Sequence, residues 1–362
     1  MKKLTRSLRA LAIATVAATA LSGCVFVPAL LEGPPVQDPD QSPTSTGFTP
    51  PPTPTTTPTA EPTETPTADP TAPPEAESVS LGELRDGNPL TSDSGEAADE
   101  PIDVTIPPST GTAAPGPNQY GDVNDGQAFT PSDGELVAST VGRLYIEFPG
   151  GRTMVCSGTV VNSEYGNMVV TAAHCLYSAI DGEMSSRVQF VPADADNGNT
   201  APYGLWEGDE WIVPQVFVDT AKEADNRSTG RGWAYDFGWV RLLPDGSGAN
   251  VQDYTGGQGI SFNQQYQGGL LVGYPSGPPF DGNSQRYCSQ QHLGFGTMYW
   301  PHLTISCSMT PGISGGGWLT GVDPSTGAGY VGAVYSTVLP DSGSGAMLGS
   351  LAYDLMKEIE QP

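Results

Sequence analysis

Three short motifs carry residue types that together could perform nucleophilic chemistry. His174 lies in the stretch Val-Val-Thr-Ala-Ala-His-Cys, Asp236 opens the stretch Asp-Phe-Gly-Trp-Val-Arg-Leu, and Ser314 lies in Thr-Pro-Gly-Ile-Ser-Gly-Gly-Gly. A serine hydroxyl is a weak nucleophile until a neighbouring imidazole accepts its proton, and a carboxylate must then orient the imidazole and stabilise its charged form. The three motifs therefore predict a catalytic serine, histidine and aspartate that the fold brings together.

The surroundings of the motifs support this interpretation. Asp236 directly precedes an apolar run, where a buried carboxylate is costly unless it is hydrogen-bonded. The glycines around Ser314 allow backbone N–H groups to point at a tetrahedral oxyanion. Gly-rich turns and single histidines also have ordinary structural roles, and we interpret the other two histidines, His292 and His302, in that way.

Short apolar runs bounded by Gly, Asn, Asp and Pro follow one another from about residue 120 and predict the strands that must position these motifs. The expected strands are 142–148, 157–161, 168–171, 187–191, 211–218, 238–243, 270–274, 303–306 and 330–337. Leu351, Leu355 and Ile359 recur four residues apart, so residues 350–359 are expected to form a helix. This pattern is typical of an all-β sandwich or barrel with one terminal helix.

Four of the five cysteines fall in two equally spaced pairs, Cys156 with Cys175 and Cys288 with Cys307. An exported chain favours two local disulfides over a metal site, although the sequence alone leaves three connectivities possible. A zinc site would need a histidine near paired cysteines, and His174 alone has that position. We therefore expect no metal and no other cofactor.

Residues 136–362 resemble the chymotrypsin-like (trypsin-like) serine peptidases. The stretch that ends in His174 and Cys175 is similar to the family's histidine motif, and Cys156 matches the half-cystine that bridges next to it. Asp236 and the apolar residues after it resemble the aspartate motif, and the turn around Ser314 resembles the Gly-Asp-Ser-Gly-Gly motif. The chain order of histidine, aspartate and serine is also that of the family.

The resemblance implies two antiparallel six-stranded β-barrels, with the triad in the cleft between them and peptide hydrolysis through an acyl-enzyme. It implies that the N–H groups of Gly312 and Ser314 form the oxyanion hole. It also suggests that Ser336, Thr337 and Val338 form the edge that pairs with substrate, with the first of them near the catalytic aspartate. A plain strand remains the alternative for that run.

Two positions depart from the family pattern. Ile313 stands where zymogen-activated members carry an aspartate that pairs with a newly cut N-terminus, so activation by that ion pair is impossible here. Ser308 stands where trypsin-type members carry an acid at the base of the specificity pocket, so a preference for lysine or arginine is not expected. Bacterial secreted members such as glutamyl endopeptidases also lack the first aspartate, so activity is still expected.

The N-terminal residues predict export. A basic start and an apolar run over residues 10–21 are typical of a secretory signal peptide, here residues 1–23, and too short for a membrane-spanning helix. The stretch Leu-Ser-Gly-Cys ending at Cys24 resembles the lipobox of bacterial lipoproteins, in which the cysteine is lipidated and becomes the new N-terminus. The alternative is an ordinary signal peptide that is cut nearby and leaves Cys24 free.

Composition divides the rest of the chain. Residues 24–118 are rich in Pro, Thr and acidic residues and are expected to form a long disordered tether ahead of a peptidase domain at 119–362. The chain has 14 Lys and Arg against 40 Asp and Glu, a net charge of −26, which argues against nucleic acid as a partner.

These observations predict a lipid-anchored serine endopeptidase on the extracytoplasmic face of a bacterial membrane. Its partners would be a protein or peptide substrate and, through Cys24, the membrane. The alternatives are a catalytically silent trypsin-like binding or scaffold module at the cell surface, and an esterase that uses the same three side chains.

Overall fold

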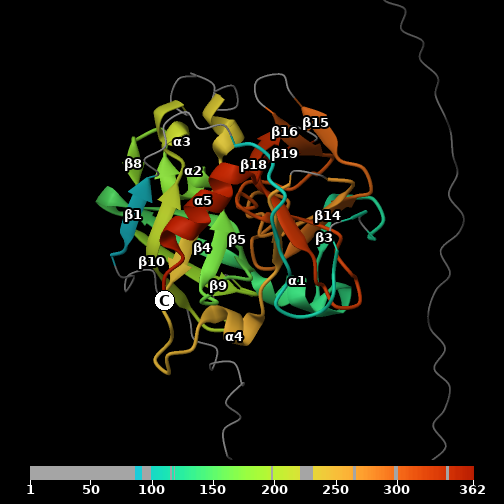
Figure 1. Ribbon diagram of the computed structural model, residues 1–362, viewed down its shortest axis with the longest axis horizontal. Helices are drawn as coiled ribbons and strands as arrows, with labels where there is room; N and C mark the ends of the chain where they lie inside the picture. The colour runs from blue at the N-terminus through green and yellow to red at the C-terminus, as the bar shows by residue number, and fades with distance from the viewer. Residues whose placement is uncertain are drawn as a thin grey trace, which may run out of the picture. The chain divides into compact units, whose positions relative to one another are not determined.

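Two large β-sheets make up the body of the protein, and one buried apolar cluster contains residues of both sheets (Figure 1). The computed structural model describes residues 86–91, 99–114, 116–117, 119–196, 199–220, 231–263, 266–296, 301–339 and 342–362. All of these fall within one compact unit, residues 66–362. The expected signal peptide, Cys24 and the expected tether up to residue 85 lie outside the described residues.

The first sheet closes into a barrel. Its strands run in the order β1-β10-β11-β6-β5-β4-β9, and β9 also pairs with β10, so six strands form a ring to which β1 is added in parallel. The strands are β1 (Asn88–Thr91), β4 (Val141–Phe148), β5 (Arg152–Val161), β6 (Met168–Thr171), β9 (Arg187–Pro192), β10 (Trp206–Val213) and β11 (Gly238–Leu242). The barrel is filled by apolar side chains that include Leu144, Val169, Phe190, Trp211 and Val240.

The second sheet curls around its own core as a half-barrel, in the order β15-β16-β19-β18-β17-β13-β14-β3, with β12 on β18 and β2 on β12. Its strands are β2 (Thr105–Ile106), β3 (Val123–Ala128), β12 (Gly259–Ser261), β13 (Gly269–Gly273), β14 (Arg286–Gln290), β15 (Gly294–Gly296), β16 (His302–Ile305), β17 (Gly317–Thr320), β18 (Tyr330–Leu339) and β19 (Ser342–Met347). A short ribbon pairs β7 (Tyr177–Ser178) with β8 (Glu183–Met184). The prediction of an all-β barrel fold with a terminal helix is confirmed.

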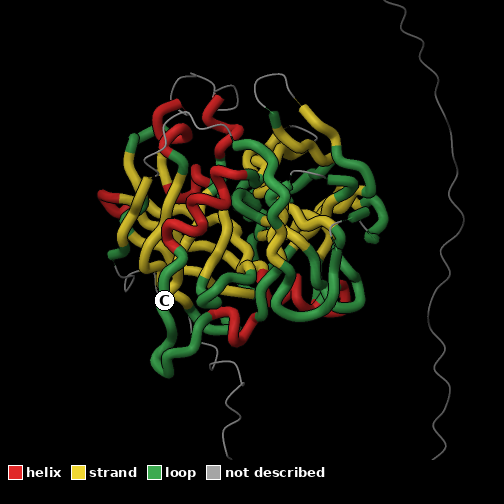
Figure 2. Tube along the Cα trace, in the orientation of Figure 1, coloured by secondary structure: helices red, strands yellow, loops and turns green. Residues whose placement is uncertain are grey.

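Helices are short and lie at the ends of strands (Figure 2). The α-helices are α1 (Glu135–Thr140), α2 (Ala173–Leu176), α3 (Gln215–Thr220), α4 (Val251–Thr255) and α5 (Ser350–Ile359). The 3-10 turns are η2 (Pro131–Asp133), η3 (Pro149–Gly151) and η4 (Arg231–Tyr235). Helix α5 has the predicted bounds, and its apolar face, with Leu351, Leu355 and Ile359, joins a core that also holds residues of both sheets.

One expected strand, 211–218, is wrong in its second half. Strand β10 ends at Val213, and α3 begins two residues later. Pro214 has no N–H to donate to a neighbouring strand, and its carbonyl instead accepts hydrogen bonds from the N–H groups of Phe217 and Val218. Val216 and Phe217 are still buried, so the apolar run marks a core segment of helical geometry.

The folded structure begins well before residue 119. We call residues 86–91 and 99–114 the N-terminal strap, whose strand β1 lies to one side of α5 in Figure 1. The strap supplies β1 and β2, and Asp99 Oδ1 accepts hydrogen bonds from the first N–H groups of α5, those of Leu351 (2.9 Å) and Ala352 (3.3 Å). Burial raises the pKa of Asp99 to about 7. The strap also packs Leu90, Ile102, Val104 and Ile106 against the core, and the polar residues around them conceal these contacts in the sequence.

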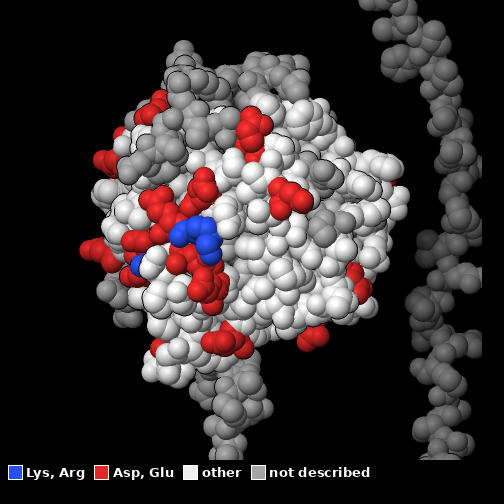
Figure 3. Space-filling model, in the orientation of Figure 1, with Lys and Arg blue, Asp and Glu red and all other residues white. Residues whose placement is uncertain are grey.

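Within the part of the chain that the structure describes, no helix is long and apolar enough to cross a membrane. Acidic side chains predominate over basic ones on the face shown in Figure 3, as the net charge of −26 leads one to expect.

Candidate functional site

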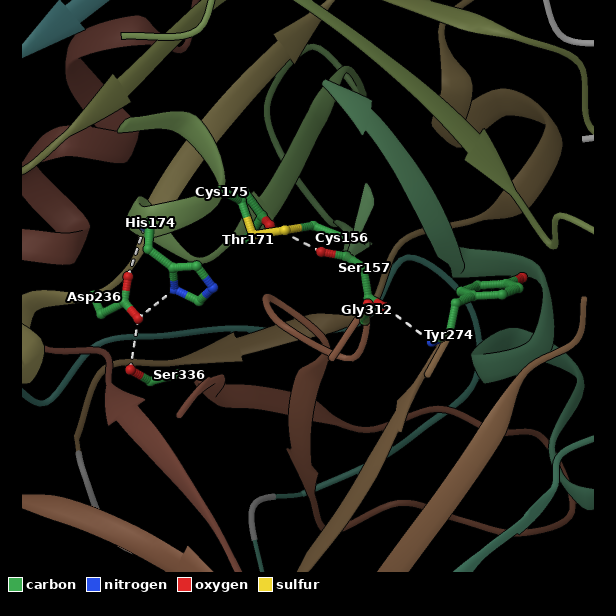
Figure 4. The surroundings of a disulfide bond; sticks show 9 residues. All are labelled: Cys156, Ser157, Thr171, His174, Cys175, Asp236, Tyr274, Gly312 and Ser336. Carbon is green, nitrogen blue, oxygen red and sulfur yellow. Dashed lines mark hydrogen bonds and ion pairs between the residues drawn. A yellow bond between two sulfur atoms is a disulfide. The ribbon is translucent and has the colours of Figure 1, made fainter. Parts of the chain in front are cut away.

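His174 is delivered by the turn that follows β6. The strand ends at Thr171, and the single helical turn α2 carries both His174 and Cys175. The disulfide Cys156–Cys175 ties this turn to β5 (Figure 4). Cys288–Cys307 forms the second disulfide, and these are the two pairs that the sequence favoured. The His174 side chain is 19% exposed, so its ring is held by the barrel and is also open to solvent.

Asp236 lies two residues before the start of β11 at Gly238 and is fully buried. Its Oδ1 accepts a hydrogen bond from the His174 N–H (2.8 Å), and its Oδ2 lies 2.7 Å from His174 Nδ1 and accepts from the Ser336 hydroxyl (2.5 Å), as Figure 4 shows. A carboxylate beside Nδ1 favours the proton on that nitrogen, which leaves the lone pair on Nε2. The buried carboxylate is thus stabilised by three donor groups.

Trp233, in η4, flanks the same imidazole. Its ring centroid lies 5.7 Å from that of His174, at an interplanar angle of 48°. Trp233 is buried and also packs edge-on against Phe217 of α3. The helix that replaces the end of the expected strand 211–218 therefore supports the wall beside His174.

Ser314 lies in the turn before β17, next to the elements that carry the histidine. Its carbonyl accepts a hydrogen bond from the N–H of Ser157 (2.7 Å), and the N–H of Gly315 donates to the carbonyl of Tyr335 (2.8 Å). Gly315 has a φ of +80°, and a Cβ there would lie 2.1 Å from Thr171 Oγ1. Only glycine fits this contact, which brings the Ser314 turn against the end of β6.

The structure brings His174, Asp236 and Ser336 into direct contact and Ser314 to the neighbouring turn. Among the described residues, no hydrogen bond joins the Ser314 hydroxyl to the His174 ring. In unliganded enzymes such catalytic hydrogen bonds are often long and tighten only when substrate binds.

The peptide between Pro311 and Gly312 has a fixed orientation. The carbonyl of Pro311 accepts hydrogen bonds from both the N–H (2.8 Å) and the hydroxyl (3.1 Å) of Ser276. In a planar trans peptide the N–H and the C=O point in opposite directions, so the Gly312 N–H points away from Ser276. Gly312 has a φ of +106°, and a Cβ there would lie 2.4 Å from the carbonyl oxygen of Tyr274.

The N–H groups of this turn fall into two sets. Those of Ile313, Gly315 and Gly316 donate to backbone carbonyls. Those of Gly312 and Ser314 make no hydrogen bond to any part of the chain that the structure describes. The two donors expected to form the oxyanion hole are thus available to an external acceptor.

Ile313, which replaces the family's aspartate, is fully buried in an apolar cluster. The same cluster contains Leu271, Trp318 and Tyr335. The turn is therefore anchored on this side by apolar packing.

The residues expected to bind substrate lie before and after the turn in the chain. Ser308 is exposed, and its N–H donates to the carbonyl of Asn124 (2.8 Å). Ser336, Thr337 and Val338 belong to β18, and the Thr337 hydroxyl is hydrogen-bonded to that of Ser344 on β19. The side chain of Val338 lies outside the described residues.

Three residues at the site were missed by sequence reasoning, namely Ser157, Trp233 and Ser276. Ser157 directly follows Cys156, the half-cystine of β5 that bridges to the histidine turn, and this is the one available signal in the sequence. Ser276 lies in a Pro- and Gly-rich loop without any distinguishing pattern.

Two further features lie near the site. The one group of three potential metal ligands found among the described residues is Cys156, His174 and Cys175, but its two sulfur atoms are bonded to each other and offer no thiolates. A cavity of about 850 Å³ lies beside η4 and includes Ala234 and Tyr235, the residues before Asp236, in its wall. Neither His174 nor Ser314 lines that cavity.

Two solved protease structures are similar to this chain in sequence and in fold. The protease Anisep of Arthrobacter nicotinovorans is 26% identical, with a TM-score of 0.51, over 61% of this chain and 95% of that protein. The thermostable serine protease AL20 from an extremophilic microorganism is 26% identical, with a TM-score of 0.52, over 62% of this chain and 98% of that protein.

The comparison with protein sequences and family models covers a smaller part of the chain. The extracellular metalloprotease of Bacillus subtilis (strain 168) is 31% identical over 115 residues, which is 32% of this chain and 31% of that protein. The chain thus matches about a third of the length of that relative. No family model matches the chain. The solved structures establish that the chain has the chymotrypsin-like serine protease fold and is a homologue of bacterial serine proteases.

Proposed function

We propose that this protein is a secreted serine endopeptidase that uses Ser314 as nucleophile, His174 as general base and then acid, and Asp236 as the orienting carboxylate. The observation that carries the proposal is the buried Asp236 carboxylate, which receives hydrogen bonds from His174 and Ser336. A buried acid bonded to an imidazole that is partly open to solvent has the arrangement that general base catalysis needs.

The geometry supports acyl transfer in two steps. With the proton held on Nδ1 by Asp236, Nε2 of His174 accepts the proton of Ser314 as Oγ attacks the substrate carbonyl carbon. The N–H groups of Gly312 and Ser314 stabilise the oxyanion that forms. His174 then donates its proton to the leaving amine, and a water molecule activated by the same ring hydrolyses the acyl-enzyme.

We propose that substrate binds along the segment of β18 that begins at Ser336, the hydrogen-bond partner of Asp236. Ser336, Thr337 and Val338 offer backbone groups along one strand edge, and Ser308 precedes the nucleophile turn in the chain. Because residue 308 is a serine and carries no negative charge, we do not expect a preference for lysine or arginine before the cleaved bond.

Export and anchoring are proposed from the N-terminus. The residues up to 23 would be removed, Cys24 would carry the lipid, and the residues up to 85 would act as the tether, since the strap from 86 onward packs on the domain. The word extracellular in the name of the Bacillus subtilis relative supports export. Detergent phase partition of the protein expressed in a lipoprotein-processing bacterium tests the anchor, because Cys24→Ala should move the protein from the detergent phase to the aqueous phase.

A fluorophosphonate probe tests the enzymatic proposal. The wild-type protein should be labelled, and Ser314→Ala should abolish labelling because the probe reacts with an activated serine. Ser247→Ala, in an exposed loop held by Asp245, is the matched control and should be labelled like wild type. A correctly folded wild-type protein that resists the probe would favour the silent binding module, and labelling without cleavage of any peptide library would favour the esterase.

A further inference from the structure

Ser157 is a fully buried serine in β5 that makes hydrogen bonds to three other segments. Its N–H donates to the carbonyl of Ser314 (2.7 Å) and its hydroxyl donates to the carbonyl of Gly312 (2.9 Å). Its hydroxyl oxygen accepts from the N–H of Tyr274 (2.9 Å), and its carbonyl accepts from Thr171 Oγ1 (2.8 Å). Figure 4 shows this residue between the histidine turn and the turn that carries Gly312.

These bonds fix the direction of the Ser157 hydroxyl. Because Oγ receives a hydrogen bond from Tyr274, its own proton is directed at the Gly312 carbonyl. With the carbonyl of Pro311 held by Ser276, the carbonyls on both sides of Gly312 are hydrogen-bonded. The Gly312 N–H between them then has little freedom to rotate away from its outward direction.

We propose that Ser157 is a positioning residue that holds the Gly312–Ser314 turn in its anion-binding form. It would replace the ion pair between an aspartate and a new N-terminus, which Ile313 cannot make. The proposal rests on the proposed function, because it assigns the Gly312 and Ser314 N–H groups to the oxyanion. Ser157 acts only through backbone carbonyls of the turn and touches no reacting atom.

Ser157 also couples the two halves of the site. It follows Cys156, whose disulfide partner Cys175 adjoins His174, and it receives the hydroxyl of Thr171 at the end of β6. The same residue thus sets the turn of Ser314 relative to the turn of His174. A pocket for its side chain exists because residue 273 is glycine, since a Cβ there would lie 2.6 Å from Ser157 Oγ and 2.5 Å from Ile313 Cδ1.

The first experiment compares Ser157→Ala with wild type in kcat, KM and inhibition by a peptide aldehyde. The aldehyde is chosen because the oxygen of the hemiacetal that it forms with the nucleophile would occupy the oxyanion hole. We expect kcat to fall roughly 10- to 100-fold, less than or similar to the loss of one oxyanion donor, with KM within about threefold of wild type. Affinity for the aldehyde should fall by a similar factor to kcat. Ser139→Ala is the matched control, because Ser139 is buried and donates to the carbonyls of Leu136 and Thr255, away from the site.

A second variant approaches the same contact from the other side. Gly273→Ala should displace the Ser157 hydroxyl and lower kcat and aldehyde affinity together, as in Ser157→Ala. Unchanged kcat and aldehyde affinity in Ser157→Ala would overturn the proposal. Equal losses in Ser139→Ala would do the same, because the effect would then follow general destabilisation.

A measurement that needs no catalysis separates this proposal from the proposed function. In the Ser314→Ala background, amide hydrogen exchange of the peptide that covers residues 312–316 should be faster with Ser157→Ala and unchanged with Ser139→Ala. If the protein with Ser314 intact proves inactive, faster exchange in Ser157→Ala would still support the positioning role, and the inactivity would reject the proposed enzyme. Protected amides in Ser157→Ala would reject the positioning role whatever the activity.

Discussion

The two halves of the candidate site are held by different kinds of contact. The half with His174 and Asp236 depends on side chains, since a buried carboxylate bonds to an imidazole and a hydroxyl, and a disulfide ties the turn to the barrel. The half with Ser314 depends on the backbone, since carbonyls of the turn accept from Ser157 and Ser276 and glycines occupy the crowded positions.

This difference fits the task that the proposed function gives to each half. An imidazole must keep one tautomer and one orientation, and a carboxylate partner provides both. An oxyanion needs two outward N–H groups, and their direction is set by the orientation of whole peptide planes. The first half is therefore sensitive to side-chain chemistry, and the second is sensitive to space and backbone conformation.

The largest effect that this comparison predicts is for Asp236→Asn. An amide at this position can present an N–H to Nδ1 and favour the wrong tautomer, so kcat should fall by about 10³- to 10⁴-fold with the fold intact. Ser336→Ala, which removes one of the donors to Asp236 and leaves the carboxylate, should cost about tenfold at most. Steady-state kinetics at neutral pH and circular dichroism check both variants, and comparable losses for the two would contradict the central role of the carboxylate.

A smaller effect is expected from Gly312→Ala in the other half. The added Cβ would meet the carbonyl oxygen of Tyr274 at 2.4 Å, at a φ of +106° that alanine disfavours. The turn must shift, and we expect kcat to fall by about 10²- to 10³-fold, as for loss of an oxyanion donor. Gly150→Ala is the control, since Gly150 also has a positive φ but an added Cβ meets no atom within 4 Å. Wild-type kcat in Gly312→Ala would show that the turn tolerates both crowding and strain.

The same contrast explains how far the sequence could predict the molecule. The motifs around His174 and Asp236 specify residue types, and their hydrogen bonds follow once the barrel brings them together. The roles of Ser157 and Ser276 depend on where backbone carbonyls point, which no local pattern encodes. The strap is a further example, because polar residues such as Asp99 bind the end of a helix some 250 positions away in the chain. The run 211–218 shows that apolar content predicts burial better than it predicts strand or helix.

The strap provides a reference region that should affect stability and leave both halves of the site unchanged. Burial raises the pKa of Asp99 to about 7 from an ordinary value of 3.8, despite the hydrogen bonds from Leu351 and Ala352. Between these two pH values the unfolded chain has released this proton and the folded protein retains it, so the contribution of Asp99 to the free energy of unfolding decreases as pH rises through that window.

Asparagine does not titrate and can accept the same two bonds. The stability of wild type relative to Asp99→Asn should therefore fall by on the order of 2 to 4 kcal/mol between pH 4 and pH 7.5 in urea unfolding, with equal kcat at each pH. A stability difference that stays constant with pH would mean that Asp99 is not held protonated in the folded protein, and a change in kcat would mean that the strap acts on one of the two halves.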